Sequence, residues 1–275
     1  MKKRSSIRLA AGILLLAALA LCAGGCQKTE SALLSEFKSM TETAPTEQGL
    51  TAAVSFIDAH IADVSEEGAS RLVLAYEDYL LRFLEAGEAP DPAAAVSDWF
   101  LIPASPETDL QCQVDYDALL ERYGDRVSPE LRELFVIKSL ETSEPSTVDS
   151  EILRTYPDLL DRALKAENLL KEHQSEDAVR ANSLEYYKNY LFLLLAGSDL
   201  TPVFNYDTGL FSPEAKEAYE DFIVTHPDTV LADVLTEYFG YLNNVNFQID
   251  YTDPVANKVF YDTCDYLIEE ALESF

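Results

Sequence analysis

Apolar residues recur at the spacing of an α-helix along almost the whole chain after Glu47. One stripe consists of Leu50, Ala53, Val54, Ile57 and Ile61, and the next of Leu72, Tyr76, Tyr79, Leu80, Phe83 and Leu84. Because residues three and four apart share one face of a helix, each stripe predicts an amphipathic helix with one buried face. The alternation typical of half-buried strands is scarce. The sequence therefore predicts an all-α fold.

Ser-Pro-Glu occurs at residues 128–130 and 212–214, where serine would cap a helix that begins at the proline. The predicted later helices cover residues 129–141, 150–173, 176–196, 213–225, 228–243 and 254–273. Only residues 200–211 favour a short β-hairpin, around the turn-forming triplet Asp207-Thr208-Gly209. That triplet is also found in aspartic proteases, but a single copy in a helical chain predicts a turn.

The three histidines, His60, His173 and His226, occupy the same local frame, four residues after Phe or Leu. Each is predicted to lie where a helix ends and a polar turn leads to the next helix. Residues 166–175 and 218–228 resemble the joins between paired helices of tetratricopeptide-type repeats. The resemblance implies stacked hairpins. We therefore expect residues 48–275 to form an irregular helical bundle or a tetratricopeptide-like array of helical hairpins, with a soft boundary near 142–148.

The N-terminal segment begins with Lys2, Lys3 and Arg4, continues with an apolar run over residues 9–21, and reaches Cys26 through Ala23-Gly24-Gly25. A 13-residue run gives a helix of about 20 Å, shorter than the roughly 30 Å hydrocarbon core of a bilayer. The segment resembles a bacterial lipoprotein signal peptide. The resemblance implies cleavage after residue 25 and a diacylglycerol on Cys26. An ordinary secretory signal, an uncleaved anchor and acylation of Cys22 are the alternatives.

Residues 26–47 are polar and rich in Ser, Thr and Glu. They are predicted to form the lipidated N-terminus and a flexible tether, with a short helix at residues 31–40. A flexible linker of about 20 residues spans roughly 25 Å. Such a tether would hold the folded domain away from the lipid headgroups.

The chain is strongly acidic, with 20 Lys and Arg against 49 Asp and Glu. Removal of residues 1–25 would take away four cations and no anions, so the charge would fall from −29 to −33. Such a field repels nucleic acid, which we exclude as a partner, and attracts cations. The alternatives are a solvated acidic surface and recruitment of Ca²⁺ or a cationic partner. Asp115-Tyr116-Asp117 lacks the further ligands of a calcium loop.

After processing, Cys112 and Cys264 would be the only unmodified cysteines. Cys264 is predicted to be a small buried residue on an apolar stripe with Val259, Phe260, Leu267 and Ala271. Cys112 lies in a predicted loop. Whether the two form a disulfide is left open by the sequence.

We find no catalytic motif, and the histidine spacing predicts no metal site and no cofactor besides the acyl chains on Cys26. Eleven of the fifteen tyrosines follow residue 155. Tyr187 and Tyr190 lie on a helical apolar stripe, which favours packing. Tyr186 lies off the stripe, and Tyr206 lies in the predicted turn region. These two tyrosines are the candidates for exposed ligand-binding residues.

Together these patterns favour a lipid-anchored extracytoplasmic protein that serves as a protein-interaction or scaffold module at the bacterial cell envelope. Its expected partners are the membrane, through the anchor, and envelope proteins or peptides. One alternative is a solute-binding lipoprotein of a transporter, which would need two α/β lobes. The other is an envelope enzyme whose site converges only in the fold.

Overall fold

The computed structural model describes residues 28–87, 90–92, 94–103, 111–175 and 177–275, and 68% of these described residues are helical. The N-terminal helices are α2 (Glu30–Thr41), α3 (Glu47–His60), η1 (Ile61–Asp63), α4 (Glu66–Glu85), η2 (Ala95–Trp99), α5 (Tyr116–Tyr123) and α6 (Pro129–Ser143). The remaining helices are α7 (Tyr156–Glu172), α8 (Ala178–Leu195), α9 (Pro213–Thr225), α10 (Val230–Asn244) and α11 (Pro254–Glu273). Two ladders complete the described chain, β1 (Phe100–Leu101) with β2 (Gln113–Val114) and β3 (Thr147–Val148) with β4 (Glu151–Ile152). The predicted all-α class is confirmed.

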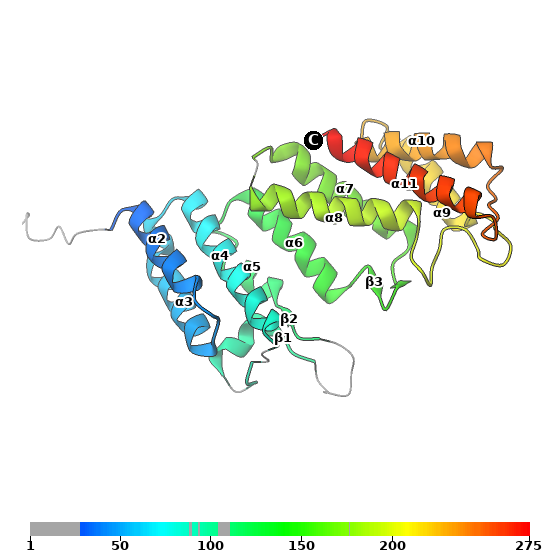
Figure 1. Ribbon diagram of the computed structural model, residues 1–275. Helices are drawn as coiled ribbons and strands as arrows, with labels where there is room; N and C mark the ends of the chain where they lie inside the picture. The colour runs from blue at the N-terminus through cyan, green and yellow to red at the C-terminus, as the bar shows by residue number, and fades with distance from the viewer. Residues whose placement is uncertain (1–27, 88–89, 93, 104–110, 176) are drawn as a thin grey trace, which may run out of the picture.

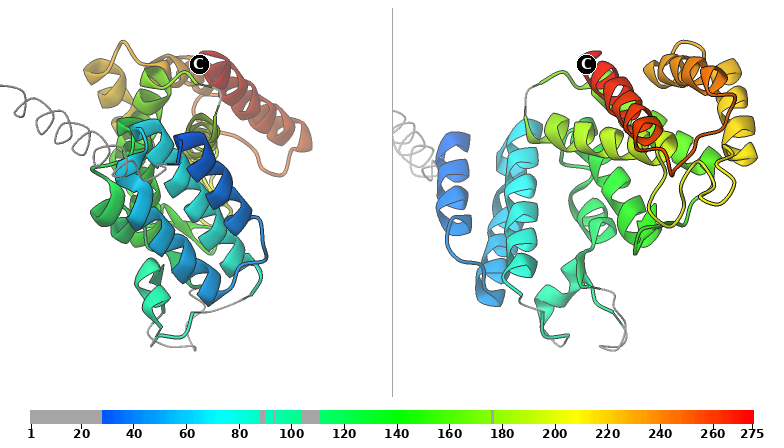
Figure 2. Two further views of the ribbon diagram at one scale, coloured as in Figure 1. Left: turned by 90° about the vertical axis from the view of Figure 1, so that its left-hand side faces the viewer. Right: turned by 45° about the vertical axis from the view of Figure 1, so that its right-hand side comes forward.

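Most consecutive helices pack against each other, although α8 with α9 and α4 with α5 do not pair closely, and together the helices form an elongated, irregular assembly (Figure 1). Helices α2, α3 and α4 pack against one another at one end, and α9, α10 and α11 lie at the other (Figures 1 and 2). Helix α11 returns along α8 and also contacts α10. Within the described residues, none of the helices combines the length and the apolar character needed to cross a bilayer.

Capping side chains fix where the helices begin. Ser128 and Ser212 each accept a hydrogen bond from the backbone N–H three residues later, with proline at the first helical position, as predicted. Ser65 caps α4 in the same way. Because each cap satisfies an N–H that the helix itself leaves free, these starts are determined locally.

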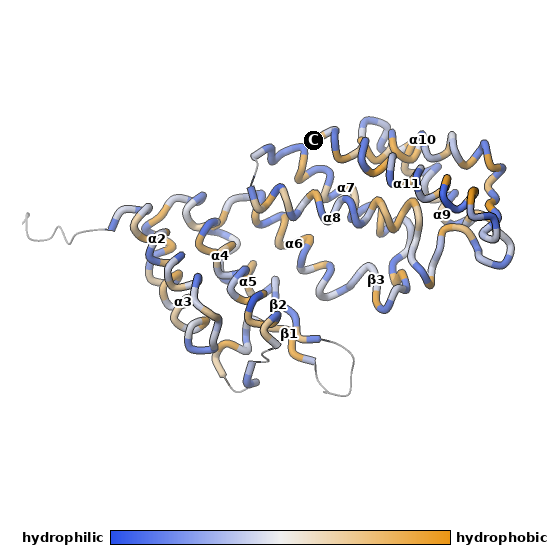
Figure 3. The backbone as a smooth tube through the Cα atoms, viewed as in Figure 1, coloured by the Kyte–Doolittle hydropathy of each residue, from blue (hydrophilic) through white to orange (hydrophobic). Residues whose placement is uncertain are grey.

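A single cluster of buried side chains extends from Phe37 in α2 to Ala271 in α11, on both sides of the predicted boundary near 142–148. Each helix carries both apolar and polar segments along its length (Figure 3). Tyrosines contribute much of the core, and two of their hydroxyls donate to the end of α8. The hydroxyl of Tyr219 donates to the carbonyl of Leu194, and that of Tyr238 donates to the carbonyl of Leu195 at 2.7 Å.

Three networks of buried charged groups connect helices across the core. Lys138 on α6 pairs with Glu77 on α4, and both side chains are 5% exposed. Arg162 on α7, 3% exposed, donates to Glu141 on α6 at 2.7 Å. The carboxylate of Glu167 on α7 is fully buried and accepts from a tyrosine hydroxyl of α8 and from two backbone N–H groups of α10. Because buried charges are stable only with partners, each network restricts how its helices pack.

The predicted tether over residues 26–47 is wrong for most of its length. Helix α2 covers residues 30–41, in line with the predicted short helix, and α3 begins at Glu47. Leu33 and Phe37 are each 1% exposed and pack into the core. Their four-residue spacing places both on one face of α2, and that face is covered by α3 and α4.

Two further predictions need correction in the second half of the chain. The helix predicted from residue 150 begins at Tyr156, because Asp149 and Ser150 adopt positive φ values of 48° and 65° and turn the chain between β3 and β4. Val259 is 48% exposed rather than part of the Cys264 stripe. Five residues separate the two positions, which places them about 140° apart around the helix.

Candidate functional site

The loop between α8 and α9, residues 196–212, is the most irregular part of the C-terminal half (Figure 1). It begins at Gly197, whose φ of 80° allows the chain to turn back on Pro202. A Cβ at Gly197 would lie 2.4 Å from the carbonyl oxygen of Thr201, so only glycine fits. Val203 and Phe204 are fully buried. The base of the loop is therefore fixed to the core.

The tip of the loop is a turn built around Asn205. Its side-chain oxygen accepts from the backbone N–H groups of Asp207 at 3.0 Å and Thr208 at 2.9 Å. Gly209, with φ 68°, approaches Ile249, whose N–H donates to the Gly209 carbonyl at 2.9 Å. The predicted turn at residues 207–209 is confirmed. The predicted hairpin over residues 200–211 is reduced to isolated bridges.

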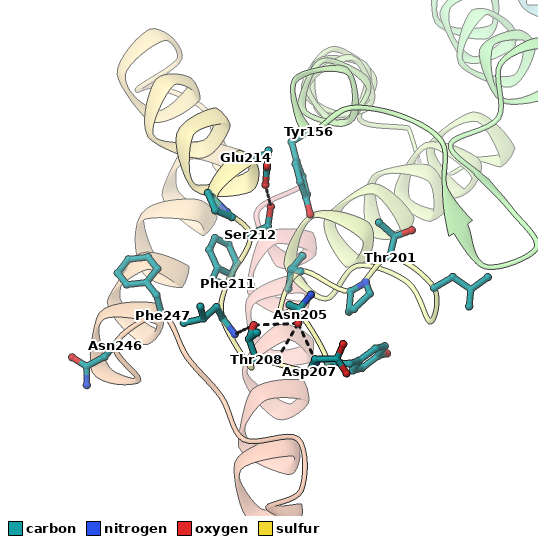
Figure 4. Close-up of a pocket in the computed structure, with 16 residues that line it drawn as sticks. Tyr156, Thr201, Asn205, Asp207, Thr208, Phe211, Ser212, Glu214, Asn246 and Phe247 are labelled. Atoms are coloured by element: carbon teal, nitrogen blue, oxygen red, sulfur yellow. Dashed lines mark hydrogen bonds between the residues drawn. The ribbon is translucent and has the colours of Figure 1, made fainter.

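A groove of about 980 Å³ opens beside this loop (Figure 4). Its apolar surface comes from three elements: Tyr156 at the start of α7, Leu210 and Phe211 in the loop, and Phe247 after α10. The polar groups that line it belong to Asn205, Asp207, Thr208, Ser212, Glu214 and Asn246. A groove of this size with an apolar surface and several polar groups is typical of ligand-binding sites.

The backbone is strained where Phe247 enters the groove. Asn246 and Phe247 have φ values of 51° and 55°. Asparagine tolerates this left-handed region, but a bulky aromatic residue rarely adopts it. The N–H of Phe247 donates to the carbonyl of Leu242 at 2.8 Å, and the carbonyl of Phe247 accepts from the N–H of Phe211 at 2.9 Å. Hydrogen bonds at both backbone groups of Phe247 therefore hold it in this conformation. Such strain, about 1–3 kcal/mol, is concentrated at functional sites.

Tyr156 forms the opposite wall of the groove. Its ring is half-buried and packs edge-on against Tyr219 at a centroid distance of 5.7 Å. Burial raises the pKa of the Tyr156 hydroxyl, and a hydrogen bond with Ser212 partly opposes this shift. The hydroxyl therefore stays protonated at neutral pH and can act as a hydrogen-bond donor.

Three tyrosines form an aromatic platform beside the groove: Tyr206, Tyr251 and Tyr261. The rings of Tyr206 and Tyr251 lie 4.7 Å apart, and the Tyr251 hydroxyl donates to the carbonyl of Phe204 at 3.2 Å. Tyr206 is 52% exposed and Tyr261 43% exposed. Burial raises the pKa of Tyr251, and the neighbouring Tyr261 and Tyr206 raise it further. The platform offers tyrosine ring faces together with the hydroxyls of its exposed members, Tyr206 and Tyr261.

The electrostatics of the groove favour a cationic or neutral ligand. Its lining contains the carboxylates of Asp207 and Glu214 and no Lys or Arg. The ammonium of Lys216 lies over the Phe247 ring, 4.5 Å from its centroid, although Lys216 is not part of the lining. No His or Cys lines the groove. Within the described ranges, no three or more His, Cys, Asp or Glu side chains form a group that could hold a metal ion. The arrangement is suited to stacking and hydrogen bonding.

The predicted site residues have different outcomes. Cys26 lies outside the described residues. Tyr206 is exposed, as predicted. Tyr186 is not: it is half-buried and its ring lies 6.3 Å from Tyr190. Burial, helped by the charges of Glu141 and Glu77, raises the pKa of Tyr186 to about 12. Tyr186 and Tyr206 line different grooves, so the structure does not bring them together.

The histidines end helices as predicted, and they lie at three separate joins. His173 pairs with Asp177 at 3.0 Å, and His226 contacts the hydroxyl of Thr225 at 2.9 Å. Cys112 and Cys264 are both free, so the disulfide that the sequence left open does not form. Burial raises the pKa of the Cys264 thiol to about 12 and also raises that of Cys112.

Sequence reasoning missed Tyr156, Tyr251 and Phe247. Tyr156 and Tyr251 come from segments far from the loop, so no local pattern connects them to it. For Phe247, the run Asn243-Asn244-Val245-Asn246 after an apolar stripe was a usable signal. Asparagine is favoured in left-handed conformations at helix C-termini.

No family model, no curated protein and no solved structure matches this chain.

Proposed function

We propose that this protein is a lipid-anchored, extracytoplasmic interaction module of the bacterial cell envelope that binds a partner protein or peptide in the groove beside the 196–212 loop. The observation that carries the binding role is the exposed tyrosine platform at the edge of an apolar, acidic groove. The observation that supports the anchor is the order of a basic start, a short apolar run and Cys26.

The groove suits a segment with apolar or aromatic side chains next to a basic one. Leu200 and Leu210, 67% and 51% exposed, extend the apolar surface around the platform. Tyrosine is enriched at interfaces because its ring packs and its hydroxyl forms hydrogen bonds. A Lys or Arg of the partner would meet the carboxylates of Asp207 and Glu214 and the faces of the tyrosine rings.

The alternative of a solute-binding lipoprotein loses its structural basis. Such proteins need two α/β lobes, and the described residues contain only two two-stranded antiparallel ladders. The groove lining holds carboxylates and hydroxyls but no His, Cys or Lys beside them, so it offers no observation that favours the enzyme alternative over binding.

The anchor is tested by metabolic labelling with a radioactive fatty acid in a bacterial host. The Cys26→Ala variant should lose the label, and the matched Cys22→Ala variant should keep it. Intact mass spectrometry of the labelled protein should give an N-terminus at residue 26. Retention of label by Cys26→Ala, or an N-terminus at Met1, would contradict the proposed anchor.

The groove is tested by photo-crosslinking and capture from envelope fractions. A partner recovered with the unsubstituted chain should be lost, by at least about tenfold, with the double variant Tyr206→Ala/Tyr261→Ala, which corresponds to roughly 1.4 kcal/mol. Tyr266→Ala is the matched control, since Tyr266 is 50% exposed on α11 and lies outside the groove lining. Equal capture by all three chains would rule out the platform as the binding surface.

A further inference from the structure

The N-terminal helix begins very close to the acylated cysteine. Only Gln27, Lys28 and Thr29 separate Cys26 from Glu30, the first residue of α2. At no more than 3.6 Å per residue, the Cα atoms of residues 26 and 30 lie within about 14 Å of each other. An anchor at Cys26 therefore holds this end of the folded domain beside the lipid headgroups.

Helix α2 is firmly attached to the rest of the domain. The carboxylate of Glu30 accepts from the backbone N–H of Ser65 at 2.8 Å and from its hydroxyl at 2.9 Å. Leu33 and Phe37 are buried against α3 and α4. The three helices lie side by side on one outer face of the molecule (Figure 2). An anchor next to α2 therefore also determines which face of the domain lies beside the membrane.

A groove of about 580 Å³ runs along this face between α2 and α4. Leu34, Leu74 and Ala75 form a half-buried apolar floor. The charged side chains of the lining are Lys38, Arg71 and Arg82 against Glu42 and Asp78. The groove is therefore net positive in a chain with 49 acidic and 20 basic residues. The lining of the groove beside the 196–212 loop, called the aromatic groove below, has by contrast two carboxylates and no cation.

Two of these cations can change partners at little cost. Arg82 is engaged, because it donates to the carbonyl of Thr41 at the end of α2 and to Asp78 at 2.8 Å. The side chains of Lys38 and Arg71 are 75% and 63% exposed, with i,i+4 carboxylate partners at 3.7 Å and 3.1 Å. Exposed pairs of this kind are weak and screened, so a phosphate can replace the carboxylate.

We propose that the α2–α4 face is the membrane-facing surface of the protein. This inference rests on the proposed acylation of Cys26. Lys38 and Arg71 contact phospholipid phosphates, while Leu34 and Leu74 face the boundary between glycerol and acyl chains. A basic side chain near an anionic membrane is attracted to the lipid phosphates. Repulsion of the remaining acidic surface fades over about 8 Å at physiological salt, so the anchor outweighs it.

This arrangement leaves the aromatic groove free for a partner. The 196–212 loop lies with α9–α11 at the end of the molecule away from α2 (Figure 1). A protein held by its α2–α4 face therefore presents the tyrosine platform away from the point of attachment. The proposed membrane-facing surface and the proposed interaction surface therefore lie at opposite ends of one continuous helical core.

Tryptophan quenching by lipids brominated on the acyl chains tests the proposal. The processed protein, acylated at Cys26, is placed in vesicles of phosphatidylethanolamine and phosphatidylglycerol. A tryptophan is introduced at exposed Ser35 in the α2–α4 groove or, as a matched control, at Val224, which is 77% exposed on α9. Trp99, 6% exposed, gives the same background in both. Ser35→Trp should be quenched at least twofold more strongly than Val224→Trp.

Charge reversal tests the headgroup contacts. Lys38→Glu/Arg71→Glu should reduce the quenching of Ser35→Trp by at least half. The control Lys216→Glu/Lys258→Glu reverses two exposed lysines of α9 and α11 and should leave it unchanged. Far-UV circular dichroism verifies that each variant is folded.

The outcomes separate the two proposals. If the unsubstituted protein does not float with vesicles, the anchor itself fails. If it floats but the two tryptophans are quenched equally, the anchor stands and the membrane-facing role of the α2–α4 face is overturned. Unchanged quenching after the Lys38 and Arg71 reversal would overturn the phosphate contacts.

Discussion

Replacement of Glu167 by alanine should destabilise the protein more than almost any other single loss of a carboxylate. Its side chain, fully buried on α7, accepts from the backbone N–H groups of Val230 at 2.9 Å and Leu231 at 2.8 Å. These are the first two residues of α10. Glu167 also accepts from the hydroxyl of Tyr187 at 3.0 Å and pairs with Lys171 at 2.7 Å. One carboxylate thus joins α7, α8 and α10.

The magnitude follows from the donors that would lose their acceptor. A buried donor left without a partner costs about 1–3 kcal/mol, and the loss of one member of a buried ionic network costs about 3–5 kcal/mol. We expect Glu167→Ala to lower the free energy of unfolding by about 3–5 kcal/mol, or Tm by roughly 10 °C for a chain of this size. Glu167→Gln should cost less, because its amide oxygen can still accept.

The assay is urea denaturation of the processed chain, followed by circular dichroism at 222 nm. Asp161→Ala is the matched control, since Asp161 is an exposed carboxylate on the same helix and its loss should change stability by about 0.5 kcal/mol or less. A change below about 1 kcal/mol for Glu167→Ala, or a change equal to that of the control, would refute the capping of α10 by Glu167.

Three further predictions concern the loop, the thiols and high pH. Gly209→Ala should destabilise the protein by at least about 2 kcal/mol, because φ at this position is 68° and a Cβ would lie 2.0 Å from the Ile249 carbonyl oxygen. Gly240→Ala is the control: it has open space around it and should stabilise the protein by about 0.5–1 kcal/mol in thermal melts. In the processed chain, Cys264 should resist a thiol reagent at pH 8 and Cys112 should react slowly. Two thiols should appear when that chain is unfolded without reductant, and fewer would contradict the finding that both cysteines are free. Burial raises the pKa of Tyr219, Tyr238 and Cys264. Above about pH 9 the unfolded chain therefore releases protons that the folded chain keeps, which favours unfolding. We expect the urea concentration at the unfolding midpoint to decrease as the pH rises from about 9 to about 11. Constant midpoints over that interval would contradict the burial of these groups.

Local patterns predicted the features that are determined locally. The Ser-Pro-Glu starts at residues 128–130 and 212–214, and the histidines at helix ends, depend only on neighbouring residues. Residues whose surroundings are set by distant segments were predicted poorly. Tyr186 lies off the apolar stripe of α8, yet α8 is covered by α6, α7 and α11, so a position off the stripe is still half-buried. Sequence reasoning treated α2 as a tether because a polar composition outweighed the spacing of Leu33 and Phe37.

The candidate groove was predicted only in part, for the same reason. Tyr206 was predicted to be exposed because it is next to a turn. Its partners Tyr251 and Tyr261 come from the α10–α11 connection and from α11, and only the folded chain brings them together. The left-handed conformation of Phe247 depends on hydrogen bonds to Leu242 and Phe211, which no local propensity specifies.

The tyrosine hydroxyls that bind the last carbonyls of α8 have a consequence for how this protein can diversify. Tyr219 and Tyr238 secure the point from which the 196–212 loop departs, while Leu200, Tyr206 and Leu210 near its tip contribute little to the interior. Substitutions of these three exposed side chains can therefore change the surface of the proposed binding groove without weakening the scaffold, provided that Asn205 and Gly209 keep the turn. The same architecture offers an engineer a graft site, where new sequences can be displayed on an unchanged helical support.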